Sequence, residues 1–294
     1  MLFFLQTLSR LPLWALYGIA DVLFIVAFYL FRWRRDIAEG NLRRAFPEKS
    51  SEEINAIARQ NYRNMGMVLA EGIWGARATA ADMRSRIIIE NPEALDPYIA
   101  RGQSPLLMAA HFCNWEWMIF TAGLYLSAPV VGVYKPQHVQ GADIFLKRMR
   151  THLGGTLIPH KDFAREVVRR RKQVFIYALI ADQTPLKSEK KHWSFFLNQD
   201  TAFFVGSDRL ARIIKAPVFF ISAKRLRRGH YALRFEQIGD PPYDAHQESA
   251  IIENYVRCLE RDIRNSPENW LWVHKKWKYK KPPDGNESCK TKQG

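Results

Sequence analysis

The hydrophobic positions of the chain fall into short apolar runs separated by amphipathic stretches. The runs lie at residues 86–90, 105–110, 129–134, 174–181, 217–223 and 231–236. Stretches with helical spacing lie between or after them, at residues 114–125, 143–153, 162–172, 206–215 and 246–265. Strands that alternate with helices in this way predict an α/β fold with a central, mostly parallel sheet covered by helices.

A longer helix is predicted ahead of this region. Ser50 and Glu53 have the spacing of a capping box, in which each side chain binds the backbone N–H of the other residue. Apolar residues then recur at helical intervals as far as Trp74. The pattern predicts an amphipathic helix from about residue 50 to residue 74.

The N-terminus carries the most apolar segment. Residues 11–31 contain one charged residue, Asp21, and would form roughly 31 Å of helix, about the thickness of a bilayer's hydrocarbon core. Aromatic residues lie near both ends, and Arg32, Arg34 and Arg35 follow directly. The run ends without the small residues of a signal-peptide cleavage site, so it is predicted to remain attached.

The arginines after the segment predict that the rest of the chain is cytoplasmic. We therefore expect a single-pass membrane protein, with an anchor at residues 1–35, an α/β domain at residues 36–281 and a polar tail at residues 282–294. Pro12, Gly18 and Asp21 weaken the span, and the alternative is a hydrophobic helix that lies on the membrane.

Composition narrows the partners. The chain has 294 residues, 44 Lys and Arg against 29 Asp and Glu, and a formal charge of +15, which favours anionic partners such as a membrane surface, phosphorylated substrates, nucleic acid or an acidic protein. Its three cysteines are far apart and predict neither a disulfide scaffold nor a clustered metal site. Near the C-terminus, Trp270, Trp272 and Trp277 alternate with lysines, a pattern that predicts a structural segment pressed on the core or the bilayer interface. No recognised module for nucleic acid is present.

The candidate chemistry lies where an apolar run ends. His111 follows residues 105–110, and Glu116 comes five residues later, after a predicted helix start near Asn114. With a strand-to-helix turn between them the two side chains can meet, and a carboxylate on one imidazole nitrogen leaves the other free as a base. Taken alone, a His and a Glu at this spacing are more often structural.

Further motifs make the pair specific. The segment His-Phe-Cys-Asn-Trp-Glu at 111–116 resembles the His-x4-acid motif of the lipid A biosynthesis (late) acyltransferases, a branch of the glycerolipid acyltransferase superfamily. The resemblance extends over nearly the whole chain, through Asn41-Leu42, Tyr134-Lys135-Pro136, Asp182-Gln183 and the segment 267–278. Residues 197–200 depart from the family pattern, in a loop on the acceptor side.

The resemblance implies an O-acyltransferase that moves a fatty acyl group from acyl carrier protein to a hydroxyl of a lipid A precursor. It implies His111 as general base and Glu116 as the group that orients it, with no metal and no cofactor. Cys113 lies inside the motif, but a thiol nucleophile is not required.

The same resemblance suggests residues that contact substrate. These are Asn114, Lys135, Asp182 and Gln183, with Lys135 the best candidate for a phosphate or sugar of the acceptor. Asp182 and Gln183 follow a predicted strand and fit the lining of the cleft and a hydrogen bond to a loop equally well. Basic clusters at 147–150 and 169–172 fit a solvated helix end as well as they fit ligand binding. The rival functions are a same-fold acyltransferase on another acceptor (a lysophospholipid, an amino-acid lipid or a glycolipid) and a non-catalytic, membrane-anchored protein that binds anions.

Overall fold

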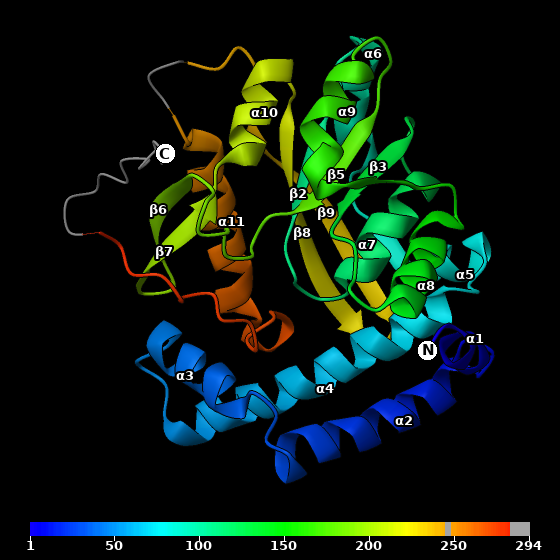
Figure 1. Ribbon diagram of the computed structural model, residues 1–294, viewed down its shortest axis with the longest axis vertical. Helices are drawn as coiled ribbons and strands as arrows, with labels where there is room; N and C mark the ends of the chain where they lie inside the picture. Colours follow the sequence, from blue (N-terminus) through cyan, green and yellow to red (C-terminus); the bar gives the residue numbers. More distant parts are fainter. Residues whose placement is uncertain (245–247, 283–294) are drawn as a thin grey trace, which may run out of the picture.

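The computed structural model describes residues 1–244 and 248–282, and its centre is a seven-stranded sheet (Figure 1). The strand order is β1-β9-β8-β2-β5-β3-β4. Five neighbours, β8 to β4 in that order, are parallel, whereas β9 is antiparallel to β8. The bounds are β1 (Ile87–Ile89), β2 (Leu106–Ala109), β3 (Val130–Tyr134), β4 (Thr156–Pro159), β5 (Ile176–Ile180), β8 (Val218–Arg227) and β9 (His230–Gly239). The predicted fold class is confirmed.

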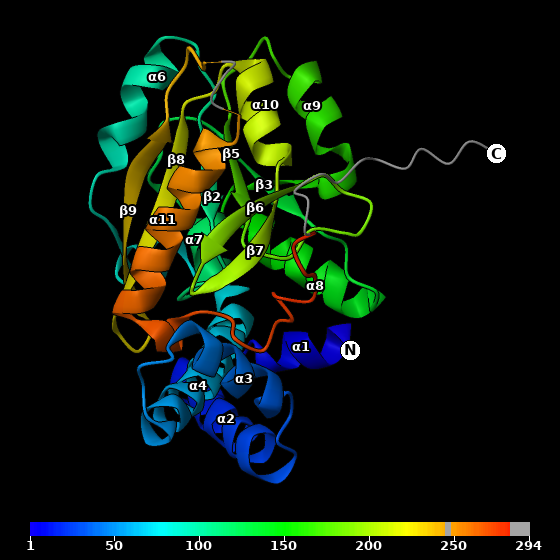
Figure 2. The same cartoon turned by 90° about the vertical axis from the view of Figure 1, so that its left-hand side faces the viewer.

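Helices cover this sheet as the alternation predicted. In Figure 2, α11 crosses in front of β8 and β9, and it packs on both strands. The helices of the α/β domain are α5 (Ala80–Arg84), α6 (Asp96–Ala100), α7 (Trp115–Thr121), α8 (Gln140–Thr151), α9 (Phe163–Arg169), α10 (Gly206–Ile214) and α11 (Ala250–Asn265). All four residues of β2 are buried, so this strand lies at the centre of the core.

Three strands were not predicted. The edge strand β4 has a single buried residue, Ile158, and therefore lacks an apolar run. The antiparallel pair β6 (Lys191–Phe196) and β7 (Gln199–Phe204) forms a separate two-stranded sheet. Leu197 and Asn198 join them with φ values of 49° and 60°, as a tight hairpin turn requires. The segment that departs from the family pattern is therefore the tip of a hairpin.

The N-terminal helices form a layer below the α/β domain (Figures 1 and 2). They are α1 (Leu2–Leu8), α2 (Leu13–Ile25) with a π-helical continuation to Leu30, α3 (Arg35–Ala45) and α4 (Ser51–Gly75). The predicted capping box at Ser50 and Glu53 is present at the start of α4. Leu13–Leu30 is long and apolar enough to cross a membrane, with a mean hydropathy of 2.0.

The predicted tail from residue 282 lies almost wholly outside the described residues, as does His246, at which the last helix was predicted to start. The segment before the tail packs against the domain. The 3-10 turn Pro267–Asn269 leads into Trp270 and Trp272, which are 3% and 0% exposed. The prediction that these tryptophans are structural agrees with their burial.

Candidate active site

Two neighbouring parallel strands bring His111 and Asp182 together. Ala109 of β2 pairs with Ile180 of β5. His111 comes two residues after Ala109, and Asp182 comes two residues after Ile180. The His111 Nδ1 atom lies 2.7 Å from Asp182 Oδ1, and the His111 backbone N–H donates to Asp182 Oδ2 at 3.0 Å. The site therefore lies at the carboxyl end of the sheet, where α/β folds place ligands.

Asp182 is held as a buried carboxylate. Its exposed fraction is 3%, and Trp270 Nε1 donates a second hydrogen bond to Oδ2 at 2.8 Å. Burial alone would raise the pKa of Asp182, but His111, Trp270 and the nearby Lys276 outweigh it and lower that pKa to about 2. An ionised Asp182 accepts a hydrogen bond from His111 Nδ1 when that nitrogen carries the proton. The Nε2 atom of the neutral imidazole then keeps a free lone pair.

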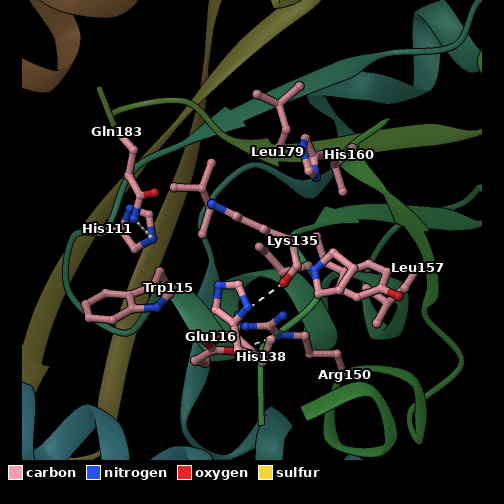
Figure 3. Close-up of a pocket in the computed structure, with 16 residues that line it drawn as sticks. His111, Trp115, Glu116, Lys135, His138, Arg150, Leu157, His160, Leu179 and Gln183 are labelled. Carbon is pink, nitrogen blue, oxygen red and sulfur yellow. Dashed lines mark hydrogen bonds and ion pairs between the residues drawn. The ribbon is translucent and has the colours of Figure 1, made fainter. Parts of the chain in front are cut away.

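The Nε2 side of His111 faces a cavity of about 420 Å³ (Figure 3). The Gln183 side-chain amide closes one side of it, with its Nε2 atom 3.3 Å from His111 Nε2. Five aliphatic side chains are among those that line the cavity: Ile119, Val133, Leu157, Leu179 and Ile180. Its polar lining includes the cations Lys135 and Arg150 and the histidines His138 and His160. A base that faces a space with both apolar and cationic walls suits a substrate with an acyl chain and an anionic group.

Glu116 lies on the same cavity but does not contact His111 as expected. It stands in the first turn of α7, and Arg150 in the last turn of α8 donates to it from Nε at 2.8 Å and Nη2 at 2.7 Å. Burial would lower the pKa of Arg150, but the Glu116 carboxylate outweighs it and raises that pKa. Asp182 occupies the position beside His111 that Glu116 was expected to fill.

Asn114 does not line the cavity, contrary to its expected contact with substrate. Its exposed fraction is 1%, and its Oδ1 accepts from the Trp117 backbone N–H at 3.0 Å, which caps α7. Its Nδ2 donates to Glu71 Oε2 at 2.6 Å. Glu71 lies in α4 and also accepts from the hydroxyls of Tyr231, at 2.6 Å, and Tyr17, at 2.8 Å. Asn114 therefore fixes the motif turn to α4.

Cys113 is unsuited to nucleophilic chemistry. It is 1% exposed and its φ of 52° turns the chain between the strand and α7. Its thiol lies 3.7 Å from the Ala223 carbonyl oxygen, and burial raises the pKa of that thiol to about 12. A thiolate is the reactive form, so this thiol is inert at neutral pH.

The remaining predicted residues divide by exposure. Lys135 is exposed at the cavity, directly after β3, and Gln183 is exposed beside His111. In the basic clusters, Lys147 pairs with Asp143 at 2.6 Å and Arg169 with Glu166 at 2.6 Å. These two cations are thus engaged within their own helices.

Sequence reasoning missed two roles. The sequence indicates Arg150 only as part of a basic cluster. It indicates Asp182 only as a residue that lines the cleft or hydrogen-bonds a loop. The pairing of β2 with β5 was the missing information, since residues at equal distance beyond paired strands meet. Lys276 lies in the segment predicted to be structural and is 1% exposed. Burial lowers the pKa of its ammonium to about 7, although the Asp182 carboxylate acts to raise that pKa.

Known proteins similar to this chain belong to one class of enzyme. The family described as bacterial lipid A biosynthesis acyltransferase matches residues 1–279. The chain is 26% identical over 283 residues to the lipid A biosynthesis lauroyltransferase of Escherichia coli K12, covering 94% of this chain and 89% of that protein. It is 23% identical to the lipid A biosynthesis palmitoleoyltransferase of the same strain, over 83% and 79% of the two chains. A lipid A biosynthesis acyltransferase of Haemophilus influenzae is 24% identical over 83% and 78%.

Proposed function

The chain belongs to the bacterial lipid A biosynthesis acyltransferase family, and we propose that it moves a fatty acyl chain from acyl carrier protein to a hydroxyl of a lipid A precursor. The observation that carries the mechanism is the contact of His111 Nδ1 with Asp182, at 2.7 Å, beside a cavity that faces Nε2. It supports His111 as the general base of the reaction.

The transfer then needs no covalent acyl-enzyme. His111 Nε2 takes the proton of the acceptor hydroxyl as its oxygen attacks the thioester carbonyl, and Asp182 stabilises the imidazolium. The tetrahedral intermediate collapses to the ester as the C–S bond breaks, and the imidazolium returns its proton to the departing thiolate. The Gln183 amide, 3.3 Å from Nε2, is close enough to donate to the oxyanion.

Arg150 and Glu116 take a binding role in this mechanism. Glu116 accepts two of the five N–H groups of the Arg150 guanidinium, which fixes its plane at the cavity wall and leaves further donors. Together with Lys135, Arg150 supplies positive charge for a phosphate of the acceptor. The carboxylate of Glu116 thus acts on the substrate through Arg150.

The same proposal places the protein at the inner membrane, with its α/β domain in the cytoplasm, where acyl carrier protein is found. The apolar segment Leu13–Leu30 supports the attachment, and the arginines that follow it support the orientation.

The test is mass spectrometry of lipid A from cells with the wild-type chain, with His111→Ala and with no copy of the gene. We expect one acyl chain to be absent from the last two samples and restored by wild type. His230→Ala, at the start of β9 and outside the residues that line the cavity, is the matched control and should restore that chain. Unchanged lipid A in the deletion strain would refute the acceptor. Full restoration by a membrane-bound His111→Ala protein would refute the base.

A further inference from the structure

The apolar helix α2 packs lengthwise on the amphipathic helix α4. Leu16 and Ala20 are buried against α4, and Gly66 allows close approach: a Cβ atom there would lie 3.2 Å from the Ala20 carbonyl oxygen. Further along, the rings of Phe28 and Tyr62 meet with centroids 5.2 Å apart. A membrane-crossing α2 would have to leave α4 or take that helix's charged residues into hydrocarbon.

The charge within the apolar segment is neutralised by the α/β domain and α4. Asp21 pairs with Arg228, in the turn between β8 and β9, through oxygens 3.0 and 3.1 Å from Nη2. It also pairs with Arg63 of α4 at 3.3 Å. A carboxylate near a bilayer centre costs about 2.5–3.5 kcal/mol or more, whereas here Asp21 points toward the protein and keeps its partners.

Both ends of the segment rest on the same domain. At one end, the Leu2 backbone nitrogen lies 2.9 Å from where a Cβ of Gly141 would be, so α1 sits against the start of α8. At the other end, Arg34 donates to the Val273 carbonyl oxygen at 3.3 Å and Tyr62 donates to the Trp33 carbonyl oxygen. Eighteen helical residues that crossed a bilayer would place these ends on opposite sides, about 27 Å apart.

The outer side of the layer is apolar and is flanked by cations. Its most exposed apolar side chains, each at least 60% exposed, are Met1, Phe3, Trp14, Val22, Leu30 and Phe31. Arg10 and Arg32 are exposed before and after α2. An apolar face with aromatic residues and flanking arginines suits the boundary between acyl chains and anionic headgroups.

We propose that residues 1–34 lie in the plane of an anionic bilayer, with Met1 and Arg34 on the same side as the α/β domain. The single span predicted by hydropathy is replaced by a monotopic layer whose inner face is α4 and whose outer face is lipid. This inference rests on the membrane attachment in the proposed function, but not on the acyl transfer.

Cysteine labelling from the periplasm distinguishes the two geometries. Arg10→Cys and Arg257→Cys are placed singly in the full chain, with Cys258 and Cys289 changed to serine. Arg257 is the matched control because it lies in α11 with a 75% exposed side chain. A membrane-impermeant maleimide is added to cells with a permeable outer membrane, before and after lysis.

Each pattern of labelling decides one question. If neither cysteine reacts before lysis and both react after it, the in-plane layer and the cytoplasmic domain are both supported. Reaction of Arg10→Cys alone in intact cells would establish a span and overturn the proposal. Reaction of both would support the in-plane layer but refute the cytoplasmic placement in the proposed function.

A charge exchange tests the contact that holds the layer. Asp21→Arg or Arg228→Asp alone should lower the Tm of the detergent-purified protein by about 2 °C or more, and the double exchange should recover at least half of the loss. A single span leaves Asp21 in lipid, where Arg228 cannot reach it. No recovery in the double variant would contradict the contact, independently of enzyme activity.

Discussion

Asp182→Asn removes the charge beside His111 while preserving the shape of the side chain. In the native site, Oδ2 accepts from two N–H groups, the His111 backbone and Trp270 Nε1, whereas Oδ1 meets His111 Nδ1. The amide oxygen of an asparagine must take the first position, so its NH₂ group faces Nδ1. That arrangement favours the tautomer with the proton on Nε2, which has no lone pair for the acceptor hydroxyl.

The magnitude follows from the lost base and the lost charge. General-base catalysis contributes about 10²–10⁴-fold, and we expect kcat to fall by this factor with little change in KM. The pKa of Asp182 is lowered from 3.8 to about 2. Ionised Asp182 therefore contributes about 2 kcal/mol to the free energy of unfolding. Because the folded pKa is the lower one, this contribution is present above pH 4 and is lost as the pH falls toward 2. The variant should lack that part of the acid dependence.

The assay combines turnover with a view of the tautomer. Initial rates with acyl carrier protein and a lipid A precursor give kcat and KM, and nitrogen NMR of labelled histidine reports which ring nitrogen carries the proton. Asp262→Asn is the matched control: Asp262 is also buried, at 8% exposed, but accepts from Ser222 and Arg261 away from the cavity. A folded Asp182→Asn protein with kcat within about threefold of wild type would refute the reasoning.

Four further outcomes are expected. Glu116→Gln should lower kcat/KM at least tenfold while the His111 tautomer seen by NMR stays native, because it loosens Arg150 and not the base; a shifted tautomer would restore the direct role first expected of Glu116. Cys113→Ser should keep near-normal turnover, and inactivation of a folded variant would reopen thiol chemistry. Activity with acyl carrier protein should decline as salt rises past about 0.1 M, where the screening length is about 10 Å. Charge reversal at residues 169–172 should raise the donor KM if that cluster docks the donor, which a titration of rate against donor concentration measures.

The predictability of the fold differed between buried and exposed elements. The six apolar runs all became strands of the main sheet. The central strands are apolar along their length because a parallel strand covered on both faces must be. The edge strand β4 escaped prediction for the opposite reason, since Thr156 is exposed and, of its four residues, Ile158 alone is buried. The hairpin β6–β7 depends on left-handed backbone at Leu197 and Asn198, neither of which is a glycine.

The candidate site was predictable in its base but not in its contacts. His111 followed from its position after a buried run, yet the partner of its ring depends on strand order, which no local pattern reveals. Glu116 is near in sequence and Asp182 is 71 residues away, and the more distant residue makes the contact. The length of the apolar segment could be predicted from the sequence. The ion pairs of its Asp21 with Arg63 and Arg228 could not, because they form only in the folded chain.

The shared carboxylate of Glu71 has a consequence for protein engineering. A shortened chain that began after residue 34 would gain solubility by losing its apolar layer, but it would also remove Tyr17 from Glu71 and uncover the side of α4 around Gly66. The Glu71 carboxylate would still accept a hydrogen bond from Asn114. Displacement of the loosened end of α4 would therefore also displace the turn that carries the motif. A soluble catalytic fragment is therefore better sought by replacing the outward apolar side chains of α2 with polar ones than by deleting the helix.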